Sequence, residues 1–464
     1  MIRRQDYWMG KVPAVLILCA LWGCADIREA RRAQDPEKRR PGERTVSAEE
    51  AGLASGSVLT VDQGVSIALK YQPTIAASRA RVEQAQATLE QVASGFYPQI
   101  SVGADYRWER NGGAGSTARA GQKIANSGII QTHGGSAQLS QLLFDWGKTS
   151  AQKDQAYANY VAAQADLSST ENDAVFNTRQ GFFDVLKQEE LVRVGEETVR
   201  GFEKRLEQVK GFVEAGTRQK YDLTKAQVDL GGAQLTLVKA RTALTVARAT
   251  LNTSLGLASE PAYTLDRQTP PGTWAMPFDE AVTAARAYHP RLQGLILREN
   301  AARFAIDAAI ADFYPELSLQ ASFSWSGSML PMNYFAFLGP ALNWVVFSGW
   351  NKTGQLHGAV ASLREAYANR ALEEQLIFLD LRQAYATLED NRESLKIASL
   401  TVKQAEETLD LVTGRFQVQK ASSVELTDAQ VQLANARAAE IQARYDFEIS
   451  IAAIQRSIGG TRKP

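Results

Sequence analysis

Side chains that could carry out covalent or metal chemistry are scarce in this sequence. The three histidines, His133, His289 and His357, lie far apart, and both cysteines, Cys19 and Cys24, fall near the N-terminus. This distribution excludes a disulfide scaffold and a Cys/His zinc site. No nucleophile–base pair, metal-ligand spacing or phosphate-binding loop is present. The sequence therefore predicts no metal, no cofactor and no enzymatic activity, and an envelope enzyme has the least support among the possible functions.

Cys24 is the residue for which the sequence predicts a covalent modification. Arg3, Arg4 and Lys11 precede a mostly apolar, uncharged run over residues 12–22, which has the length of a signal-peptide core and is too short to span a membrane. The run ends in Leu21-Trp22-Gly23-Cys24, which is similar to a lipobox. We expect residues 1–24 to be a signal peptide and Cys24 to be lipidated.

The residues around Cys24 also allow another cleavage site. Trp22 departs from the small residue that is usual at this place in a lipobox, and Gly23 and Ala25 suit ordinary cleavage after Ala25. Residues 25–57 then carry dense charges of both signs, two prolines and no apolar period. That composition predicts a disordered, solvated tether.

Bulk composition excludes two further classes of protein. The chain of 464 residues has 51 basic and 51 acidic side chains, so it lacks the basic footprint of a nucleic-acid-binding protein. Mean hydropathy is −0.25. Beyond the N-terminus no apolar run approaches the ~18 residues that a spanning helix needs, which argues against a bundle of transmembrane helices.

The sequence contains two copies of one repeat. Pro73 and Pro290 lie 217 positions apart, as do Pro98 and Pro315, within the repeated triplets Phe96-Tyr97-Pro98 and Phe313-Tyr314-Pro315. Later landmarks, such as Gly256 and Gly459, lie 203 positions apart, so the first copy holds extra residues in its glycine-rich stretch over 111–135. We expect a first repeat over 58–260, a linker over 261–276, a second repeat over 277–460 and a tail over 461–464.

After each Tyr-Pro pair the sequence alternates with a period of two. Apolar residues occupy every second position in both copies: Ile100, Val102, Ala104, Tyr106 and Trp108, then Leu317, Leu319, Ala321, Phe323 and Trp325. Residues between them are mostly polar or small, which is typical of a transmembrane β-strand with one face toward lipid and one toward a lumen. A half-buried sheet in a soluble domain is the alternative for any single strand, and the export signal and duplication favour the membrane. Trp108, Trp325 and Trp344 are candidates for an interfacial aromatic girdle.

Long helices fill the rest of each repeat. No proline occurs between Pro98 and Pro261 or between Pro340 and Pro464. The 64 residues from Gly147 to Gly211, and the same number from Trp350 to Gly414, would extend ~96 Å as helix. Asp145 and Ser348 stand where N-caps are expected. The returning helices carry heptads of large and small residues typical of antiparallel coiled coils: Leu223, Ala226, Leu230, Ala233, Leu237, Ala240, Leu244, Ala247 and Leu251, with counterparts from Leu426 to Ile454.

Four candidate strands per chain are too few to close a membrane barrel. Every backbone amide in lipid must be paired, and known barrels begin at about eight strands. Two chains would give eight strands and a filled interior, whereas three chains would give twelve and leave room for a lumen. The predicted fold is therefore mainly α, with long antiparallel coiled coils forming an α-barrel and four β-strands per chain in a twelve-stranded trimeric β-barrel.

The order and duplication of these motifs resemble the TolC-type outer-membrane efflux family over about residues 58–460. Besides the two Phe-Tyr-Pro triplets, the motifs are the strand exits Phe144-Asp145-Trp146-Gly147 and Phe347-Ser348-Gly349-Trp350, and the helix tips Glu214-Ala215-Gly216-Thr217 and Ser423-Val424-Glu425-Leu426. The resemblance implies a homotrimer in the outer membrane with its helical barrel in the periplasm. It also implies a periplasmic adaptor and an inner-membrane pump as partners. The lipobox is similar to that of the family's lipoprotein branch.

The resemblance also assigns site residues. Acidic residues line the periplasmic constriction in this family, and the matching positions are Glu425 and Asp428. Residue 421 is Ala, where a basic partner is common, and Lys420 is its possible substitute. The first tip, with Gly216, Thr217, Asp222 and Leu223, would contact the adaptor. The alternative for Glu425 and Asp428 is that they are solvated charges of a coiled coil. The alternative for the first tip is a plain connection between two helices.

The function that these features predict is an outer-membrane export channel of a tripartite efflux or type I secretion system. A periplasmic coiled-coil scaffold without a pore is the alternative. The sequence leaves the cargo open between small molecules, metals and secreted polypeptide.

Overall fold

The computed structural model describes residues 56–110, 129–258, 263–267, 272–327, 333–418 and 420–460. It also describes Ile27, Ala30, Arg40 and residues 42–44, 46–47 and 49–53. The predicted signal peptide with Cys24, the tail over 461–464 and the glycine-rich segment over 111–128 lie outside the described residues.

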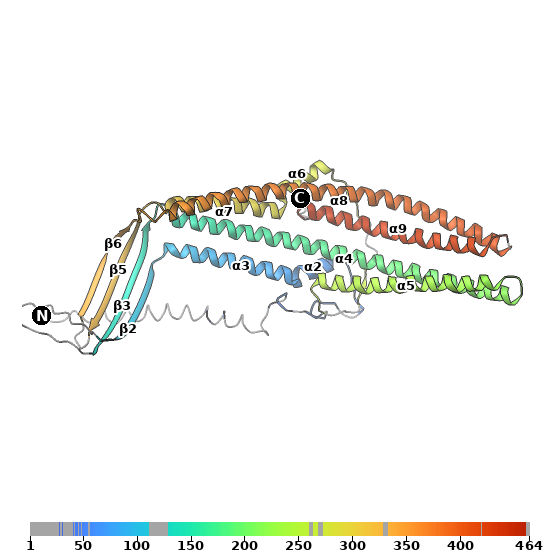
Figure 1. The fold of residues 1–464 in the computed structure, drawn as a ribbon, viewed down its shortest axis with the longest axis horizontal. Coiled ribbons are helices and arrows are strands. Elements are labelled where there is room, and N and C mark those ends of the chain that lie inside the picture. Colours follow the sequence, from blue (N-terminus) through green and yellow to red (C-terminus); the bar gives the residue numbers. More distant parts are fainter. Residues whose placement is uncertain are drawn as a thin grey trace, which may run out of the picture. The chain divides into compact units, whose positions relative to one another are not determined.

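Each copy of the repeat has two short helices, two strands and two long helices in the same order (Figure 1). The elements of the first copy are α2 (Val61–Tyr71), α3 (Pro73–Ala93), β2 (Gln99–Arg110), β3 (Ile129–Phe144), α4 (Lys148–Glu214) and α5 (Lys220–Leu255). Those of the second are α6 (Phe278–Tyr288), α7 (Pro290–Ala311), β5 (Glu316–Gly327), β6 (Asn333–Asn343), α8 (Asn351–Gln417) and α9 (Ser423–Ile458). The long helices have 67 and 36 residues in both copies, so the duplication is confirmed.

The chain folds into two compact units, and each unit takes segments from both copies. The first unit comprises Met1–Arg79, Ser169–Ala287 and Phe378–Pro464, and the second comprises Ala80–Ser168 and Tyr288–Ile377. The first holds the helix tips and the short parallel pair β1 (Val58–Leu59) and β4 (Thr264–Leu265). The second holds the four-stranded sheet.

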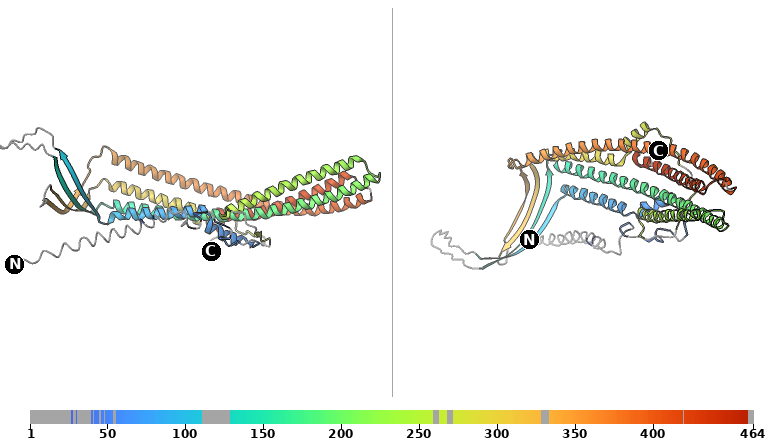
Figure 2. Two further views of the ribbon diagram at one scale, coloured as in Figure 1. Left: turned by 90° about the horizontal axis from the view of Figure 1, so that it is seen from below. Right: turned by 45° about the vertical axis from the view of Figure 1, so that its right-hand side comes forward.

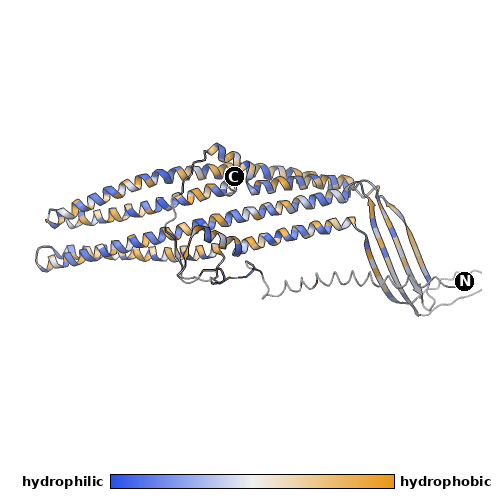
Figure 3. Ribbon diagram, turned by 180° about the vertical axis from the view of Figure 1, so that it is seen from behind, coloured by the Kyte–Doolittle hydropathy of each residue, from blue (hydrophilic) through white to orange (hydrophobic). Residues whose placement is uncertain are grey.

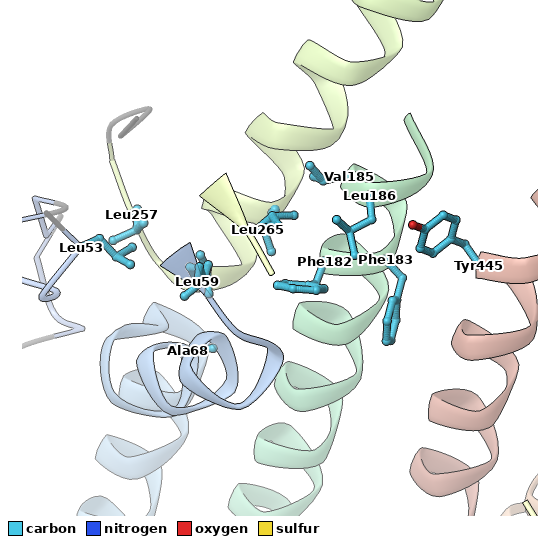
Figure 4. Packing of buried hydrophobic residues seen from close by; sticks show 12 residues of the cluster. Leu53, Leu59, Ala68, Phe182, Phe183, Val185, Leu186, Leu257, Leu265 and Tyr445 are labelled. Atoms are coloured by element: carbon cyan, nitrogen blue, oxygen red, sulfur yellow. The ribbon is translucent and has the colours of Figure 1, made fainter. Parts of the chain in front are cut away.

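The core of the first unit forms where helix α4 meets α5 and the short strands. Phe182 and Phe183 of α4 pack with Leu59, Leu265 and Tyr445 (Figure 4). A bridge between Val46 and Leu257 extends this core. Val46 and Leu53 are buried, so the last part of the predicted tether packs against the unit instead of being solvated. The expectation of a disordered segment is wrong for these residues, because isolated apolar side chains dock there on an existing core.

Helices α4 and α5 form one antiparallel hairpin, and α8 and α9 form the other (Figure 2). The predicted heptad of α5 faces α4, since Ala226, Leu237 and Leu251 are buried. Leu237 packs directly over Gly195 of α4. In the second hairpin, Leu433 and Ala436 pack with Val402 and Ala405 of α8. The predicted coiled coils are therefore confirmed in both copies.

The long helices begin at Lys148 and Asn351, three residues after the predicted N-caps Asp145 and Ser348, whose side chains still accept hydrogen bonds from amides at the helix starts. The Asp145 carboxylate accepts hydrogen bonds from the amides of Gly147 (3.1 Å) and Thr149 (2.7 Å). The Ser348 hydroxyl accepts one from the Lys352 amide (3.4 Å). Between strand and helix, Trp146 and Trp350 adopt left-handed φ values of 57° and 69°. The Trp146 indole N–H donates to the Pro315 carbonyl (3.0 Å), which helps to hold this strained turn.

The four strands form an antiparallel sheet in the order β2-β3-β5-β6. Pairs such as Val102–Ala137 and Ala137–Phe323 place the predicted apolar residues on one face. Pairs such as Ser101–Gln138 and Gln138–Ser322 place polar residues on the other. Figure 3 shows hydrophobic and hydrophilic residues alternating along the strands. Strands β2 and β6 are the open edges.

In the part of the chain that the structure describes, no helix combines the length and apolarity needed to cross a membrane. The same residues contain no cluster of His, Cys, Asp and Glu that could hold a metal ion.

The apolar face of the sheet depends on a glycine beneath a tryptophan. A Cβ atom built on Gly135 of β3 would lie 2.1 Å from the Trp325 ring of β5, its direct partner across the strands. We expect Gly135→Ala to lower the stability of the folded protein by about 1–3 kcal/mol through overpacking. Urea unfolding of the detergent-solubilised protein, followed by tryptophan fluorescence, measures this effect.

Gly103→Ala is the matched control, because a Cβ atom there would meet only the Ser136 hydroxyl, at 3.2 Å. It should change stability much less. Adding Trp325→Ala to Gly135→Ala should restore part of the loss. Equal stability of the Gly135 and Gly103 variants would show that the ring moves aside freely.

Candidate channel gate and membrane surface

Glu425 caps the helix that follows the second tip. Its backbone N–H donates to the Ser422 hydroxyl (3.1 Å), and its carboxylate accepts from the Ser422 amide (3.1 Å), which completes a capping box at the start of α9. The Ser422 amide and then the Ser422 hydroxyl hold the pKa of Glu425 below its usual value. This predicted gate residue therefore has a local structural task that sequence reasoning did not assign.

Arg415 is the basic partner of Glu425. The guanidinium Nη1 lies 3.7 Å from the Glu425 carboxylate, and Nη2 donates to the Lys420 carbonyl (3.2 Å). Lys420, the predicted substitute, takes part through its backbone: its amide donates to the Arg415 carbonyl (2.8 Å). Sequence reasoning missed Arg415 because it lies on α8, and no helical spacing relates it to α9.

Asp428 lies one turn after Glu425 and is exposed. Within the described residues its carboxylate has no ion pair and no hydrogen bond. The structure thus separates the two predicted gate acids: the charge of Glu425 is engaged by Ser422 and Arg415, whereas that of Asp428 is open to solvent.

The first tip is built differently from the second. Gly216 closes α4 with a left-handed φ of 72°, and Thr217 donates from its amide and its hydroxyl to the Phe212 carbonyl (both 2.9 Å). Gly216 and Thr217 are exposed, while Asp222 and Leu223, in the first turn of α5, are half-buried. The four residues predicted for adaptor contact thus form one surface, of which the Gly216–Thr217 turn is the accessible part.

A buried arginine links the two hairpins near their tips. Arg205 of α4 is 2% exposed, and its Nη2 donates to both the carbonyl and the hydroxyl of Ser423 at the start of α9. Burial lowers the pKa of this guanidinium, and Asp229 and Asp222 oppose the shift. Its Nε and Nη1 atoms have no hydrogen-bond partner among the described residues. Because Arg205 is buried and has few hydrogen bonds, losing its bonds to Ser423 would leave a buried charge without partners, which costs free energy.

Two further contacts join the hairpins at the same level. The Thr427 hydroxyl of α9 donates to the Asp229 carboxylate of α5 (3.1 Å), which also pairs with Lys225 (3.3 Å). The Phe416 ring of α8 packs edge to face with Phe212 of α4, 6.5 Å between centroids. The two tips are therefore tied by a charged, a polar and an aromatic contact.

The three predicted girdle tryptophans belong to different ends of the sheet. Trp108 and Trp325 lie on the apolar face near the ends of β2 and β5 that point away from the helices, beside Tyr106 and Phe323. Trp344 directly follows β6 at the helical end, where its indole N–H donates to the Phe313 carbonyl (3.0 Å). Trp146, which stacks on Tyr314 at 5.0 Å, belongs to that same end and was not predicted. Aromatic residues thus bound the apolar face at both ends, as at two membrane interfaces.

Comparisons with known proteins agree with this architecture. A model of the outer membrane efflux protein family matches residues 64–257 and 281–460, one segment in each repeat. The outer membrane efflux protein BepC of Brucella suis is 22% identical over 424 residues, which are 88% of this chain and 89% of BepC.

Solved structures give the same fold. The CmeC outer membrane channel of Campylobacter jejuni superposes with a TM-score of 0.79 at 16% identity, covering 86% of this chain and 85% of CmeC. VceC, an outer membrane protein of Vibrio cholerae, gives 0.73 at 17% identity, covering 86% and 96%. The fold is that of an outer-membrane channel with a periplasmic helical barrel.

The chain belongs to the outer membrane efflux protein family. Its place is the outer membrane, with the helical barrel in the periplasm, and its function is that of an efflux channel.

We expect the free charge of Asp428 to act on ions more strongly than the engaged charge of Glu425. Asp428→Asn should reduce the cation-to-anion permeability ratio about two- to fivefold, since a carboxylate within several ångströms of an ion in water contributes about 1 kcal/mol. Glu425→Gln keeps the capping box, because Gln also serves at that position, and should change the ratio less. Reversal potentials in planar bilayers under a salt gradient measure both. A larger effect at Glu425 would reverse this assignment.

Breaking the Arg205 link should favour an open tip. Arg205→Met keeps the apolar bulk and removes both bonds to Ser423, and hydrogen bonds to a charged group contribute about 1.5–3 kcal/mol. Mean single-channel conductance should therefore rise. Arg241→Met is the control, because exposed Arg241 pairs with Glu196 inside the first hairpin. Unchanged conductance of the Arg205 variant, or an equal rise in both, would contradict a link between the hairpins that restrains the tip.

Proposed function

We propose that the chain forms a homotrimer in which three sheets close one twelve-stranded barrel and the long helices continue it as a tube. In this assembly it is the outer-membrane channel of a tripartite efflux or type I secretion system. The observation that carries the proposal is the sheet itself, with four strands and two open edges.

The open edges cannot remain unpaired in lipid. Strands β2 and β6 have 12 and 11 residues, and each leaves one row of backbone N–H and C=O groups without partners among the residues that the structure describes. Each such group costs several kcal/mol in hydrocarbon, which is why only closed barrels persist there. The two edges run antiparallel in the chain order, so β6 of one copy and β2 of the next suit an antiparallel junction that continues the pattern.

The helices offer a second surface for self-association. Large apolar side chains on α5 and α8 point away from their own hairpins and are more than half exposed: Tyr221, Val228, Leu235, Val238 and Val246 on α5, and Ile397, Leu400 and Leu411 on α8. Such stripes on a single chain mark interaction surfaces. Side-by-side packing of these hairpins from neighbouring copies would bury the stripes in a continuous wall.

The remaining partners follow from family membership and the tips. A periplasmic adaptor would contact the exposed turn at Gly216 and Thr217, and an inner-membrane pump would supply cargo and energy. Asp428 and Glu425 would stand at the periplasmic constriction. Lipid on Cys24 would anchor the chain in the outer membrane with ~0.8 kcal/mol for each buried CH₂ group. Selection between small molecules and secreted polypeptide would belong to the pump.

Disulfide cross-linking between copies tests the trimer. The two native cysteines precede the described sheet, so a single added pair can be followed cleanly. Ser101→Cys on β2 combined in turn with Phe337→Cys, Gly339→Cys or Ala341→Cys on β6 should give covalent oligomers after oxidation, with the trimer as the largest closed species. Light scattering of the unmodified protein in detergent should show three chains in each particle.

Ser140→Cys with Gln320→Cys is the matched control, because these residues pair directly within one chain. It should form a bond without joining chains. A monomer in detergent, with no cross-link at any of the β6 positions, would refute the proposed assembly.

A further inference from the structure

The polar face of the sheet is almost uniform in its chemistry. Register pairs assign to it the small or amide side chains of three neighbouring strands: Gln99, Ser101 and Gly103 on β2, Ser136, Gln138 and Ser140 on β3, and Ser318, Gln320, Ser322 and Ser324 on β5. In the proposed trimer this face lines the lumen. A wall of this kind is well hydrated and offers few apolar contacts to a passing molecule.

Leu142 on β3, opposite Ser318, and two phenylalanines on β6 break this pattern. Phe335 pairs with Ser324, and Phe337 pairs with Ser322, so both rings lie on the polar face, while Leu338 lies on the apolar face opposite Ala321. In the single chain Phe335 is 63% exposed and Phe337 is 44% exposed. In the proposed trimer the strand on their other side would be β2 of the next copy. Because their neighbours on β5 are serines, no large side chain covers the rings from that strand.

The register of the sheet does not require aromatic side chains at these positions, although the Phe337 ring packs beside Gly339, 3.4 Å from where a Cβ atom of residue 339 would stand. On β6 the backbone pairs with β5 through residues of every size on this face, including Gly339 and Ala341. Exposure of a large apolar group to water is unfavourable in proportion to its surface. Two adjacent exposed rings on an otherwise hydrophilic wall therefore indicate a surface that contacts something apolar.

The charges on the same face favour a cation. Among the described side chains of the polar face, the carboxylates of Asp105 and Glu316 face one guanidinium, that of Arg107. Arg107 pairs with Asp105 at 3.1 Å, which leaves Glu316 as the net negative charge. The faces of aromatic rings also attract cations, and they stack with other aromatic rings.

We propose that Phe335 and Phe337 form a binding strip on the channel wall for aromatic cations that pass through the lumen. This inference rests on the proposed function, because only a closed barrel turns the polar face into a lumen. It adds a ligand class and a contact site to that function. Small serines beside the rings leave space for an aromatic ring of the ligand to lie against them.

Block of ion current by tetraphenylphosphonium tests the strip. The full-length protein is reconstituted in planar bilayers, and the probe is added on the side reached by the strand ends distant from the helices. We expect concentration-dependent block in the unmodified protein. In the double variant Phe335→Leu/Phe337→Leu, which keeps apolar bulk but loses the rings, block should be about five- to thirtyfold weaker. Phe335→Tyr/Phe337→Tyr keeps the rings and should retain the block.

Three controls separate the possible results. Tetraethylammonium, a cation without rings, should block all variants equally and weakly, and benzenesulfonate should block less than tetraphenylphosphonium. Leu338→Ala, on the opposite face of the same strand, should leave the block unchanged. Equal block by tetraphenylphosphonium in the Phe and Leu proteins would overturn the binding strip while leaving the channel intact. Absence of any channel current in the unmodified protein would overturn the proposed function, and the strip with it.

Discussion

The pairing of backbone amides in the membrane is the constraint on which the rest of the structure depends. A sheet of four strands that ends in the open edges β2 and β6 has no stable form in lipid as a single copy. The proposed association would therefore be a condition of folding in the membrane. Because the sequence is duplicated, each repeat supplies one strand hairpin and one helix hairpin with the same order of elements.

Duplication also allows the two tips to differ. Where the second tip has a complete capping box and the acid Asp428, the first has Gln219 without a side-chain cap, and Lys225 at the position of Asp428. Lys225 pairs with Asp229, which in turn accepts from Thr427 of the second hairpin. The first tip thus presents an accessible turn, and the second carries the solvent-exposed acid Asp428. Residues of both tips make the contacts that join the hairpins. Helices α4 and α8 have equal lengths, so the two tips lie equally far along their helices from the sheet.

Much of the fold could be predicted from the sequence because its periods are strict. The alternation at 100–108 and 317–325 was sufficient to assign both faces of β2 and β5, and the Leu/Ala heptad identified the buried side of α5. Strand β6 was harder, since Phe335 and Phe337 make it apolar on both faces, and only its pairing with β5 reveals which side each ring takes. Arg205 and Arg415 were missed because their partners lie on other helices, at separations that no local spacing encodes.

Glu425 and Asp428 of the second tip belong to the same sequence motif but have different roles in the structure. Residue 425 occupies the third position of α9, where an acid or amide completes the capping box with Ser422 whatever lies beyond the helix. The helix start alone therefore accounts for an acid at this position, and Arg415 offsets its charge. Asp428 serves no such need: it comes one turn later, is exposed, and has no partner within the described residues. In the proposed trimer the Asp428 charge, which makes no contact that stabilises the fold within the described residues, would be repeated around the symmetry axis and would be the one available to act on what passes through.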